Sequence, residues 1–530
     1  MEPSDRSESR DHDGDRLDRL IRFLGDPATH GLAAGPVSEP IETHGAVVVL
    51  AGDRAYKIKK PVDLPYMDLS TVARRRRICR REVEINRRTA PELYLGVGEV
   101  VVGRDGGWRL CGPEDEPGEG ERAIEPVVVM RRFDGDMLFD RLAERGELAD
   151  RDLDRLAAAV AEAHAGAPKR RRTAGSTLVA DVLAINRAGL ESAVPTVFDA
   201  AAVRDLLART SAMADALGDH LDARGRRGRV RRCHGDLHLR NVFRGPDGDP
   251  VLFDALEFDE ELATVDVAYD LAFLLMDLLH RGLDAGANRV WNGWLSATRD
   301  DEAAGMMPLF LSMRAAVRAH VGATAATQHG LDRARAAEAG RYLAEARRYL
   351  DEVAPVVVAI GGISGTGKTT LARAVAPALG RMPGAAVLRS DVIRKQAFGV
   401  AETVHLPPEA YRSEVSRRVM ATVHRRARRL AGLGSAVVAD TVYGRPEDRR
   451  AVAAAARRAG VRFVGVWLEL PAEQAGARVS ARTGDASDAT REVVEHQADT
   501  ITAPHDWLRL DAGRPVPDLV SAVLAAVAGS

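Results

Sequence analysis

The last third of the chain alternates short apolar runs with longer stretches of helical periodicity. The apolar runs, rich in β-branched residues, lie at 356–360, 385–389, 436–440, 462–468 and 507–510. Strands separated by helix-length segments are typical of a parallel sheet with crossover helices. We therefore predict an α/β domain with a parallel sheet over residues 351–530, beginning where the pattern changes near Asp351–Pro355.

Before that boundary the pattern mixes hairpins with helices. Two apolar runs between Val47 and Lys60, separated by Gly52-Asp53, predict a β-hairpin. Further strands are expected at 97–102, 108–111 and 125–131, a second hairpin at 241–254, and helices at 71–89, over most of 138–225 and up to about 349. We predict an α+β domain over residues 35–350. The charged, apolar-poor residues 1–15 are expected to form a disordered tail.

Composition and charge narrow the class of protein. The 530 residues are 45% hydrophobic and 29% charged, as in soluble globular domains, and the formal net charge is −2. This balance gives no overall field to attract nucleic acid or an anionic membrane. No apolar run approaches the ~18 residues needed to span a bilayer, and the first residues lack the apolar stretch of a signal peptide. We expect a cytoplasmic protein that binds neither nucleic acid nor membrane.

The basic residues are nearly all arginines. Only six of the 75 are lysines, at positions 57, 59, 60, 169, 368 and 395. Lysine is a compact point charge that can reach one phosphate oxygen in a tight pocket, so each of these positions is a candidate for a role that arginine cannot fill. Arginine runs at 74–77, 170–172 and 226–232 lack interleaved aromatic residues, and we interpret them as solvated faces and loops.

A glycine-rich loop follows the first strand of the predicted α/β domain, and an apolar-periodic helix begins directly after it. The loop matches G-x-x-x-x-G-K-[ST], and the nucleotide-binding residues expected there are Gly362, Ile363, Ser364, Gly365, Thr366, Gly367, Lys368, Thr369 and Thr370. Its glycines let backbone N–H groups point at phosphate oxygens, and the helix N-terminus adds partial positive charge. Lys368 can reach the β and γ phosphates, and the Thr369 hydroxyl can bind Mg²⁺. A chance match in a glycine-rich turn is the alternative.

Two carboxylates follow the next strands of the same domain. Asp391 follows the second strand and Asp440 ends the third, which places both at the edge where α/β sheets bind ligands. Arg478 and Arg482, beside a polar stretch, suit a lid that meets the transferred phosphoryl charge. The alternatives are that Asp391 caps a helix and that Asp440 is a turn residue.

This arrangement resembles small-molecule P-loop kinases of the gluconate-kinase and chloramphenicol-phosphotransferase type. The resemblance implies that Asp391 accepts the proton of the acceptor hydroxyl and that Asp440 is the Walker B carboxylate near Mg²⁺. The two roles could also be exchanged.

A second motif lies in the predicted α+β domain. His234, Asp236 and Asn241 form H-x-D-x-x-x-x-N, and a hairpin then leads to Asp254. A kinase-like site needs one carboxylate to orient the acceptor hydroxyl, and an amide with another carboxylate to hold metal between phosphates. Asp236 has the type and position of the catalytic base, and Asn241 and Asp254 those of metal ligands. His234 would brace the loop by hydrogen bonding.

This segment resembles the aminoglycoside phosphotransferase family, whose fold is related to that of protein kinases, over roughly residues 35–345. The family implies a strand lysine paired with a helix glutamate around the ATP phosphates. Lys57 and Lys59 project to one face of their strand; we favour Lys57 and leave Lys59 open. Glu82 falls near the centre of the apolar face of its helix, where a carboxylate needs a partner. An outward salt bridge of Glu82 is the alternative.

Three more acids lie near this motif. On the same resemblance Asp266 and Asp270 are structural residues that brace the catalytic loop. Glu257 is either an additional metal ligand or a solvated acid at a strand end.

Taken together, the motifs predict a fused protein, similar to bacterial proteins that join an aminoglycoside-phosphotransferase-like domain to a P-loop ATP-binding domain. The predicted activity is ATP- and Mg²⁺-dependent transfer of the γ-phosphoryl group to hydroxyls of small metabolites. The alternative is an ATP-binding regulator or switch, in which one domain senses nucleotide and controls the other.

Overall fold

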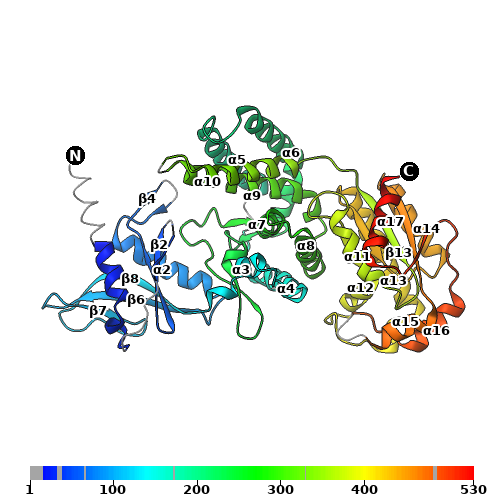
Figure 1. The fold of residues 1–530 in the computed structure, drawn as a ribbon, viewed down its shortest axis with the longest axis horizontal. Coiled ribbons are helices and arrows are strands. Elements are labelled where there is room, and N and C mark those ends of the chain that lie inside the picture. The colour runs from blue at the N-terminus through cyan, green and yellow to red at the C-terminus, as the bar shows by residue number, and fades with distance from the viewer. Residues whose placement is uncertain are drawn as a thin grey trace. The chain divides into compact units, whose positions relative to one another are not determined.

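The computed structural model describes residues 16–529 apart from 33–38, 44, 65–66, 171–173, 329 and 482–485. The predicted tail at 1–15 therefore lies outside the described residues. Two compact units are formed, which we describe separately (Figure 1). Unit 1 comprises residues 1–152, 162–171 and 228–270, and unit 2 comprises residues 153–161, 172–227 and 271–530. The boundary at 351 between consecutive domains stays a prediction.

Unit 1 is built on a six-stranded antiparallel sheet in the order β1-β2-β3-β8-β6-β7. Its strands are β1 (Ile41–Glu42), β2 (Ala46–Ala51), β3 (Arg54–Lys59), β6 (Tyr94–Val102), β7 (Trp108–Cys111) and β8 (Arg122–Arg131). Shorter strands are β4 (Asp63–Leu64), β5 (Met67–Asp68), β9 (Val230–Arg232), β10 (Val242–Arg244), β11 (Pro250–Leu252) and β12 (Thr264–Asp266). The predicted hairpins are confirmed as β2–β3, which turns at Gly52 with φ of 57°, and as β10–β11.

Helix α2 (Val72–Asn86) lies against the sheet of unit 1. The Thr71 side chain caps it by accepting a hydrogen bond from the backbone N–H of Arg74 at 3.3 Å. Its apolar face, with Cys79 and Val83, packs on Ala55 of β3 and Val128 of β8. The apolar face of α2 is therefore the one that faces the strand lysines. Further helices that enter unit 1 include a helix at 16–25, α3 (Phe139–Glu144), α4 (Asp150–Gly166) and α7 (Val267–His280), of which α4 and α7 also contribute to unit 2.

Among the described residues of the basic runs, two arginines are buried in unit 1. Arg75 is 4% exposed and forms a two-pronged ion pair with Glu125, with N–O distances of 2.5 and 2.7 Å. Arg232 is 1% exposed, and its Nε donates to Glu260 at 2.9 Å. The interpretation of the runs as wholly solvated was wrong at these positions, because a guanidinium paired with a carboxylate tolerates burial.

Unit 2 contains a layer of helices and a five-stranded parallel sheet in the order β14-β15-β13-β16-β17 (Figure 1). The helical layer contains α5 (Gly175–Ser192), α6 (Ala200–Arg226), α8 (Asp284–Thr298), α9 (Ala303–Thr327) and α10 (Arg333–Arg348). The strands are β13 (Val356–Gly361), β14 (Ala386–Arg389), β15 (Val437–Asp440), β16 (Arg462–Glu469) and β17 (Leu508–Asp511). All five predicted strands and their parallel pairing are confirmed.

Helices connect successive strands of the parallel sheet. They are α11 (Lys368–Val375), α12 (Ser390–Ala397), α13 (Ser413–Gly432), α14 (Pro446–Arg458), α15 (Ala472–Ser480) and α16 (Arg491–Thr500), and α17 (Val516–Ala528) follows the last strand. Central strands are buried on both faces, as the continuous apolar runs predict; Val358, Ile360, Val438 and Val466 are fully buried in one core with α11 and α17. The carboxyl ends of β13, β14 and β15 therefore meet at one edge. Among the described residues, no helix combines the length and apolarity needed to cross a membrane.

Candidate active sites

The two strand lysines share one buried carboxylate in unit 1. Lys57 Nζ lies 2.7 Å from Glu82 Oε1, and Lys59 Nζ lies 2.6 Å from Glu82 Oε2. Burial alone would raise the pKa of Glu82, but the two ammonium groups lower it to about 2. The carboxylate is therefore ionised, and the expected pairing of Glu82 with Lys57 is present together with a second pairing to Lys59. The alternative of an outward salt bridge is wrong, because Glu82 is fully buried.

Each lysine also reaches one further acid. Lys57 Nζ lies 2.6 Å from Asp254 Oδ1, and Lys59 Nζ lies 2.5 Å from Glu257 Oε1. Burial lowers the pKa of Lys57, but Asp254 and Glu82 outweigh it and raise the pKa well above its usual value. The Glu257 side chain is 9% exposed, so it is not the solvated strand-end acid considered above. Lys57 thus contacts the candidate metal ligand Asp254, whereas Lys59 contacts Glu257, which stays a candidate additional ligand.

A strained backbone turn places Asp254 beside Lys57. Asp254 has φ of 59°, in the left-handed region that costs a residue other than glycine about 1–3 kcal/mol. Two buried side chains of unit 1 stabilise the turn. The backbone N–H of Asp254 donates to the Tyr94 hydroxyl at 3.2 Å, and that of Ala255 donates to Asn86 Oδ1 at 2.8 Å. Sequence reasoning missed both; the signal for Asn86 is its position one turn after Glu82.

The loop predicted to be catalytic holds Asp236 and Asn241 together. Asn241 Nδ2 donates to the backbone oxygen of Asp236 at 2.9 Å and to its Oδ2 at 3.1 Å. His238 Nε2 lies 3.4 Å from the same Oδ2, and the Asp236 side chain remains 41% exposed. The amide nitrogen of Asn241 is thus directed at Asp236, which leaves its side-chain oxygen for another partner. An exposed carboxylate beside an amide oxygen suits the acceptance of a hydroxyl proton next to a metal site.

Asp270 braces the backbone of this loop with both of its carboxylate oxygens. Its Oδ1 accepts a hydrogen bond from Gly235 N at 2.8 Å, and its Oδ2 accepts one from His234 N at 3.3 Å. His164 Nε2 lies 3.1 Å from the same Oδ2. His234 Nε2 lies 2.9 Å from the backbone oxygen of Phe253, which ties the loop to the residue before Asp254. Sequence reasoning missed His164, which comes from α4.

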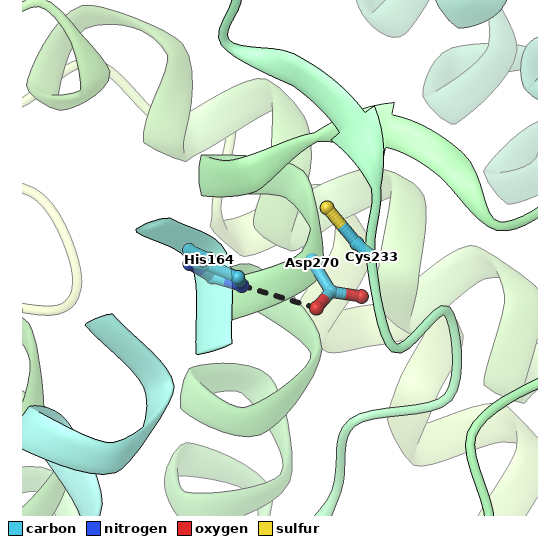
Figure 2. A group of neighbouring side chains, drawn as sticks. All are labelled: His164, Cys233 and Asp270. Atoms are coloured by element: carbon cyan, nitrogen blue, oxygen red, sulfur yellow. Dashed lines mark hydrogen bonds and ion pairs between the residues drawn. The ribbon is translucent and has the colours of Figure 1, made fainter. Parts of the chain in front are cut away.

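The group of His164, Cys233 and Asp270 in Figure 2 also has metal-ligand residue types. Burial raises the pKa of the Cys233 thiol well above its usual value, with Asp270 adding to the shift. The thiol donates a hydrogen bond to the backbone oxygen of Val265 at 3.6 Å. Because both oxygens of Asp270 already accept hydrogen bonds from the loop, this group is a brace. Asp266, the other predicted structural acid, accepts from Ala268 N at 2.8 Å at the start of α7.

In unit 2 the predicted phosphate loop connects β13 to α11. Gly362, Gly365 and Gly367 have φ of 139°, 88° and 87°, and a Cβ on Gly365 would lie 2.3 Å from the backbone oxygen of Ala475. Glycine is therefore required there by conformation and by space. Lys368 Nζ donates to the backbone oxygen of Ile363 at 2.8 Å, so the lysine lies across its own loop.

The two predicted carboxylates flank this loop. Thr369 Oγ1 donates to Asp440 Oδ2 at 2.6 Å, which brings together the hydroxyl and the acid expected to hold Mg²⁺. Asp440 is the last residue of β15, not a turn residue. Asp391 lies in the first turn of α12, whose N-cap residue is Arg389, and no side chain caps that helix. Burial raises the pKa of Asp391, and the neighbouring Asp440 adds to the shift.

Of the two predicted lid arginines, only Arg478 is described. Its Nη2 donates to the backbone oxygen of Ala512 at 3.3 Å, and its Nη1 lies 3.9 Å from where a Cβ on Gly367 would be. Arg478 therefore lies beside the phosphate loop. Arg482 falls outside the described residues, and its role stays a prediction.

Sequence reasoning missed three contacts that connect the segment after α15 to the rest of this site. Lys395 is 1% exposed, and its Nζ lies 2.7 Å from Asp488 Oδ1; Leu406 N also donates to Asp488, at 3.0 Å. Gln497 on α16 accepts a hydrogen bond from Ser364 N of the phosphate loop at 2.7 Å. The rarity of lysine was the available signal for Lys395.

Two family models match the chain, one over residues that include Asp236 and Asn241 and the other over residues that include the phosphate loop. Residues 77–306 match the phosphotransferase enzyme family, and residues 357–504 match a family described as an AAA domain. The fold and both matches define a fusion of a phosphotransferase domain with a P-loop kinase-type domain, as predicted.

Over 505 residues the chain is 33% identical to an uncharacterized protein of Mycobacterium tuberculosis, covering 92% of this chain and 94% of that protein. An uncharacterized protein of Mycobacterium bovis matches to the same extent. The chain belongs to the family that includes these mycobacterial proteins.

Solved structures resemble the two regions separately. A choline/ethanolamine kinase family protein from Mesorhizobium loti is 16% identical and covers 63% of this chain and 95% of its own, with a TM-score of 0.41. A gluconokinase from Sinorhizobium meliloti is 20% identical and covers 34% of this chain and 94% of its own, with a TM-score of 0.25. At these scores the likenesses carry no inference about the acceptor.

Proposed function

We propose that the chain is a bifunctional ATP-dependent phosphotransferase that moves the γ-phosphoryl group of ATP to hydroxyls of small metabolites at two sites. The observation that carries the proposal is the position of Lys57 Nζ between Glu82 and Asp254, at 2.7 and 2.6 Å. The phosphates of ATP require a fixed cation, and their metal requires a carboxylate that it can reach. Lys57 is a buried ammonium held by the helix carboxylate Glu82, and it is directed at the partly exposed carboxylate of Asp254. A purely structural ion pair needs only one of these acids.

At the N-terminal site each side chain has a distinct task. Lys57 orients the phosphates, and Asp254 and the Asn241 side-chain oxygen are the hard oxygen donors that fit Mg²⁺. Bound Mg²⁺ would neutralise charge on the phosphates. Asp236 orients the acceptor hydroxyl and takes its proton as the phosphoryl group is transferred. Asp270 fixes the loop that carries Asp236, so the base does not depend on a mobile backbone.

The C-terminal site divides the same work differently. The phosphate loop supplies backbone N–H groups and Lys368 to the phosphates, and Thr369 with Asp440 provides the oxygen donors that fit Mg²⁺. Asp391 accepts the acceptor proton. Its raised pKa makes it a stronger base than an ordinary aspartate once ionised. Arg478 stabilises charge on the moving phosphoryl group, and the predicted Arg482 would add to it.

The test of phosphoryl transfer uses the full chain, isotope-labelled ATP and a metabolite extract, with products detected by their gain of one phosphate. Asp236→Asn should reduce one set of products and Asp391→Asn another, each by about 10²–10⁴-fold, the usual contribution of a positioned base. Asp247→Asn, at an exposed aspartate in the β10–β11 turn, is the matched control and should leave both sets unchanged. ATP binding without any phosphorylated product would favour the regulator or switch.

Nucleotide stoichiometry tests the claim of two sites without an acceptor. Calorimetry should find two ATP molecules per chain in the presence of Mg²⁺, and Lys368→Ala should abolish binding of one of them. A single ATP in the wild-type chain would contradict the bifunctional assignment.

A further inference from the structure

Strand β14 lies at the edge of the parallel sheet in unit 2. It pairs only with β15 among the described strands, in a register that runs from Ala386↔Val437 to Arg389↔Asp440. On the other side of an edge strand, the N–H and C=O groups of alternate residues lack a neighbouring strand. This particular edge matters because α12, which carries Asp391, begins directly after β14.

Helix α8 satisfies that edge with side-chain amides. Asn292 accepts a hydrogen bond at Oδ1 from Val387 N at 2.7 Å, and its Nδ2 donates to the backbone oxygen of Ala385 at 3.1 Å. Asn288, one turn earlier and 3% exposed, donates to Ala385 at 3.1 Å and to the backbone oxygen of Pro383 at 2.9 Å. Two asparagines spaced four residues apart thus occupy the place of a sixth strand.

The same face of α8 continues onto α12. Gln396 Nε2 donates to the backbone oxygen and to the hydroxyl of Ser296, both at 2.9 Å. Arg299, at the C-terminal end of α8, donates to the backbone oxygen of Gln396 at 3.2 Å. Shortly after the end of α8, Asp301 pairs with α13, where Arg426 Nη2 lies 2.7 Å from Asp301 Oδ1. Helix α8 therefore contacts both the strand before Asp391 and the far end of the helix that carries it.

These contacts matter because α12 is weak by itself. It has eight residues and no side-chain cap, and helices of that length need tertiary contacts to form. Helix α8 falls inside residues 77–306, which match the phosphotransferase family, whereas β14 and α12 fall inside residues 357–504. The helix that carries Asp391 is thus held by a helix that the other family match contributes.

We propose that Asn288, Asn292 and Ser296 are positioning residues of the C-terminal site, and that α8 completes that site by fixing β14 and α12. That α8 holds β14 and α12 in place does not depend on the reaction. That this affects catalysis rests on the proposed function of Asp391. The phosphate loop follows β13, which lies between β15 and β16. Helix α8 also contacts α11, the helix after that loop, but Asn292 forms its hydrogen bonds with Val387 and Ala385 at the β14 edge. Loss of the Asn292 contacts should therefore affect acceptor-side chemistry and leave nucleotide binding intact.

Hydrogen–deuterium exchange on the full chain tests the placement at single amides. In Asn292→Leu the Val387 amide loses its only acceptor among the described residues, so its exchange should accelerate at least about fivefold, with the α12 amides following. The matched control is Asn186→Leu, at a buried asparagine on α5 that donates to the backbone oxygen of Met313.

The outcomes separate cleanly. Unchanged exchange of Val387 and α12 in Asn292→Leu would overturn the inference, as would equal acceleration in Asn186→Leu. Where the products that depend on Asp391 are observed, Asn292→Leu should reduce their formation about tenfold, without changing the affinity for ATP at Lys368. A parallel loss of ATP affinity would indicate general unfolding and also overturn the inference. Absence of phosphorylated products in the wild type would refute only the proposed function, because hydrogen exchange is measured without a phosphoryl-acceptor substrate.

Discussion

Lys59 gives the sharpest test of how buried charge stabilises the sheet of unit 1. Its side chain is 4% exposed, and its ammonium lies 2.6 Å from Glu82 and 2.5 Å from Glu257. Lys59→Met preserves most of the apolar stem but leaves the carboxylate of Glu257 without its cation. Removing one partner of a buried ion pair costs about 3–5 kcal/mol, because the remaining charge is uncompensated. We expect the free energy of opening of the β3–β8 ladder to fall by this amount.

Native-state hydrogen exchange at β3 and β8 measures that free energy locally. A local measurement is needed because a chain with two compact units has no single free energy of unfolding. Lys60→Met is the matched control, since Lys60 pairs at 2.9 Å with a mostly exposed Glu42. Such a pair contributes about 0–1 kcal/mol. Lys59→Met combined with Glu257→Gln removes both charges and should recover much of the loss. Equal effects of Lys59→Met and Lys60→Met, or no recovery in the double variant, would refute the reasoning.

Three further predictions concern the two sites. Lys57→Met should lower turnover at the N-terminal site about 10²–10³-fold, because a positioned charge on the phosphates is lost; initial rates measure it, and a change confined to the KM for ATP would contradict it. Thr369→Val removes the hydroxyl next to Asp440, so Mg²⁺ should no longer strengthen ATP binding there; calorimetry with and without Mg²⁺ decides, and an unchanged Mg²⁺ effect would exclude Thr369 as a ligand. Burial raises the pKa of Asp391, and this base works only when ionised. The rate at the C-terminal site should therefore begin to decline, as the pH falls, at a pH above the ordinary aspartate pKa of about 3.9. A pH–rate profile measures this, and a rate that stays unchanged down to about pH 4 would contradict the prediction.

Local patterns predicted most of the fold. The continuous apolar runs became β13 to β17 because a central parallel strand is buried on both faces, and the turn at Gly52 joined β2 to β3. Helical periodicity placed Glu82 on the buried face of α2, and strand alternation placed both lysines opposite it. These are properties of residues close together in the chain, so one sequence is enough to show them.

Contacts between distant segments could not be predicted in this way. His164 reaches Asp270 across 106 positions, and Asn292 reaches Val387 across 95. Asn292 is an asparagine on a helix and His164 is a histidine near a helix end. The residues next to them in sequence do not show which distant segment either one contacts. The choice between Lys57 and Lys59 was open for a related reason, since alternation gives both the same face and only the position of Asp254 separates them.

The coverage of β14 by α8 also bears on why the two domains occur in one chain. A P-loop fragment produced alone would expose the Ala385 carbonyl and the Val387 amide on an open sheet edge. Such an edge is a template on which a second copy can add its own strand, which leads to aggregation. Covalent fusion supplies the covering helix at a high local concentration as soon as each chain folds. In these terms the phosphotransferase half would also protect the P-loop half from aggregation, and a mutation that separates them would reduce the yield of soluble protein as well as the activity of the C-terminal site.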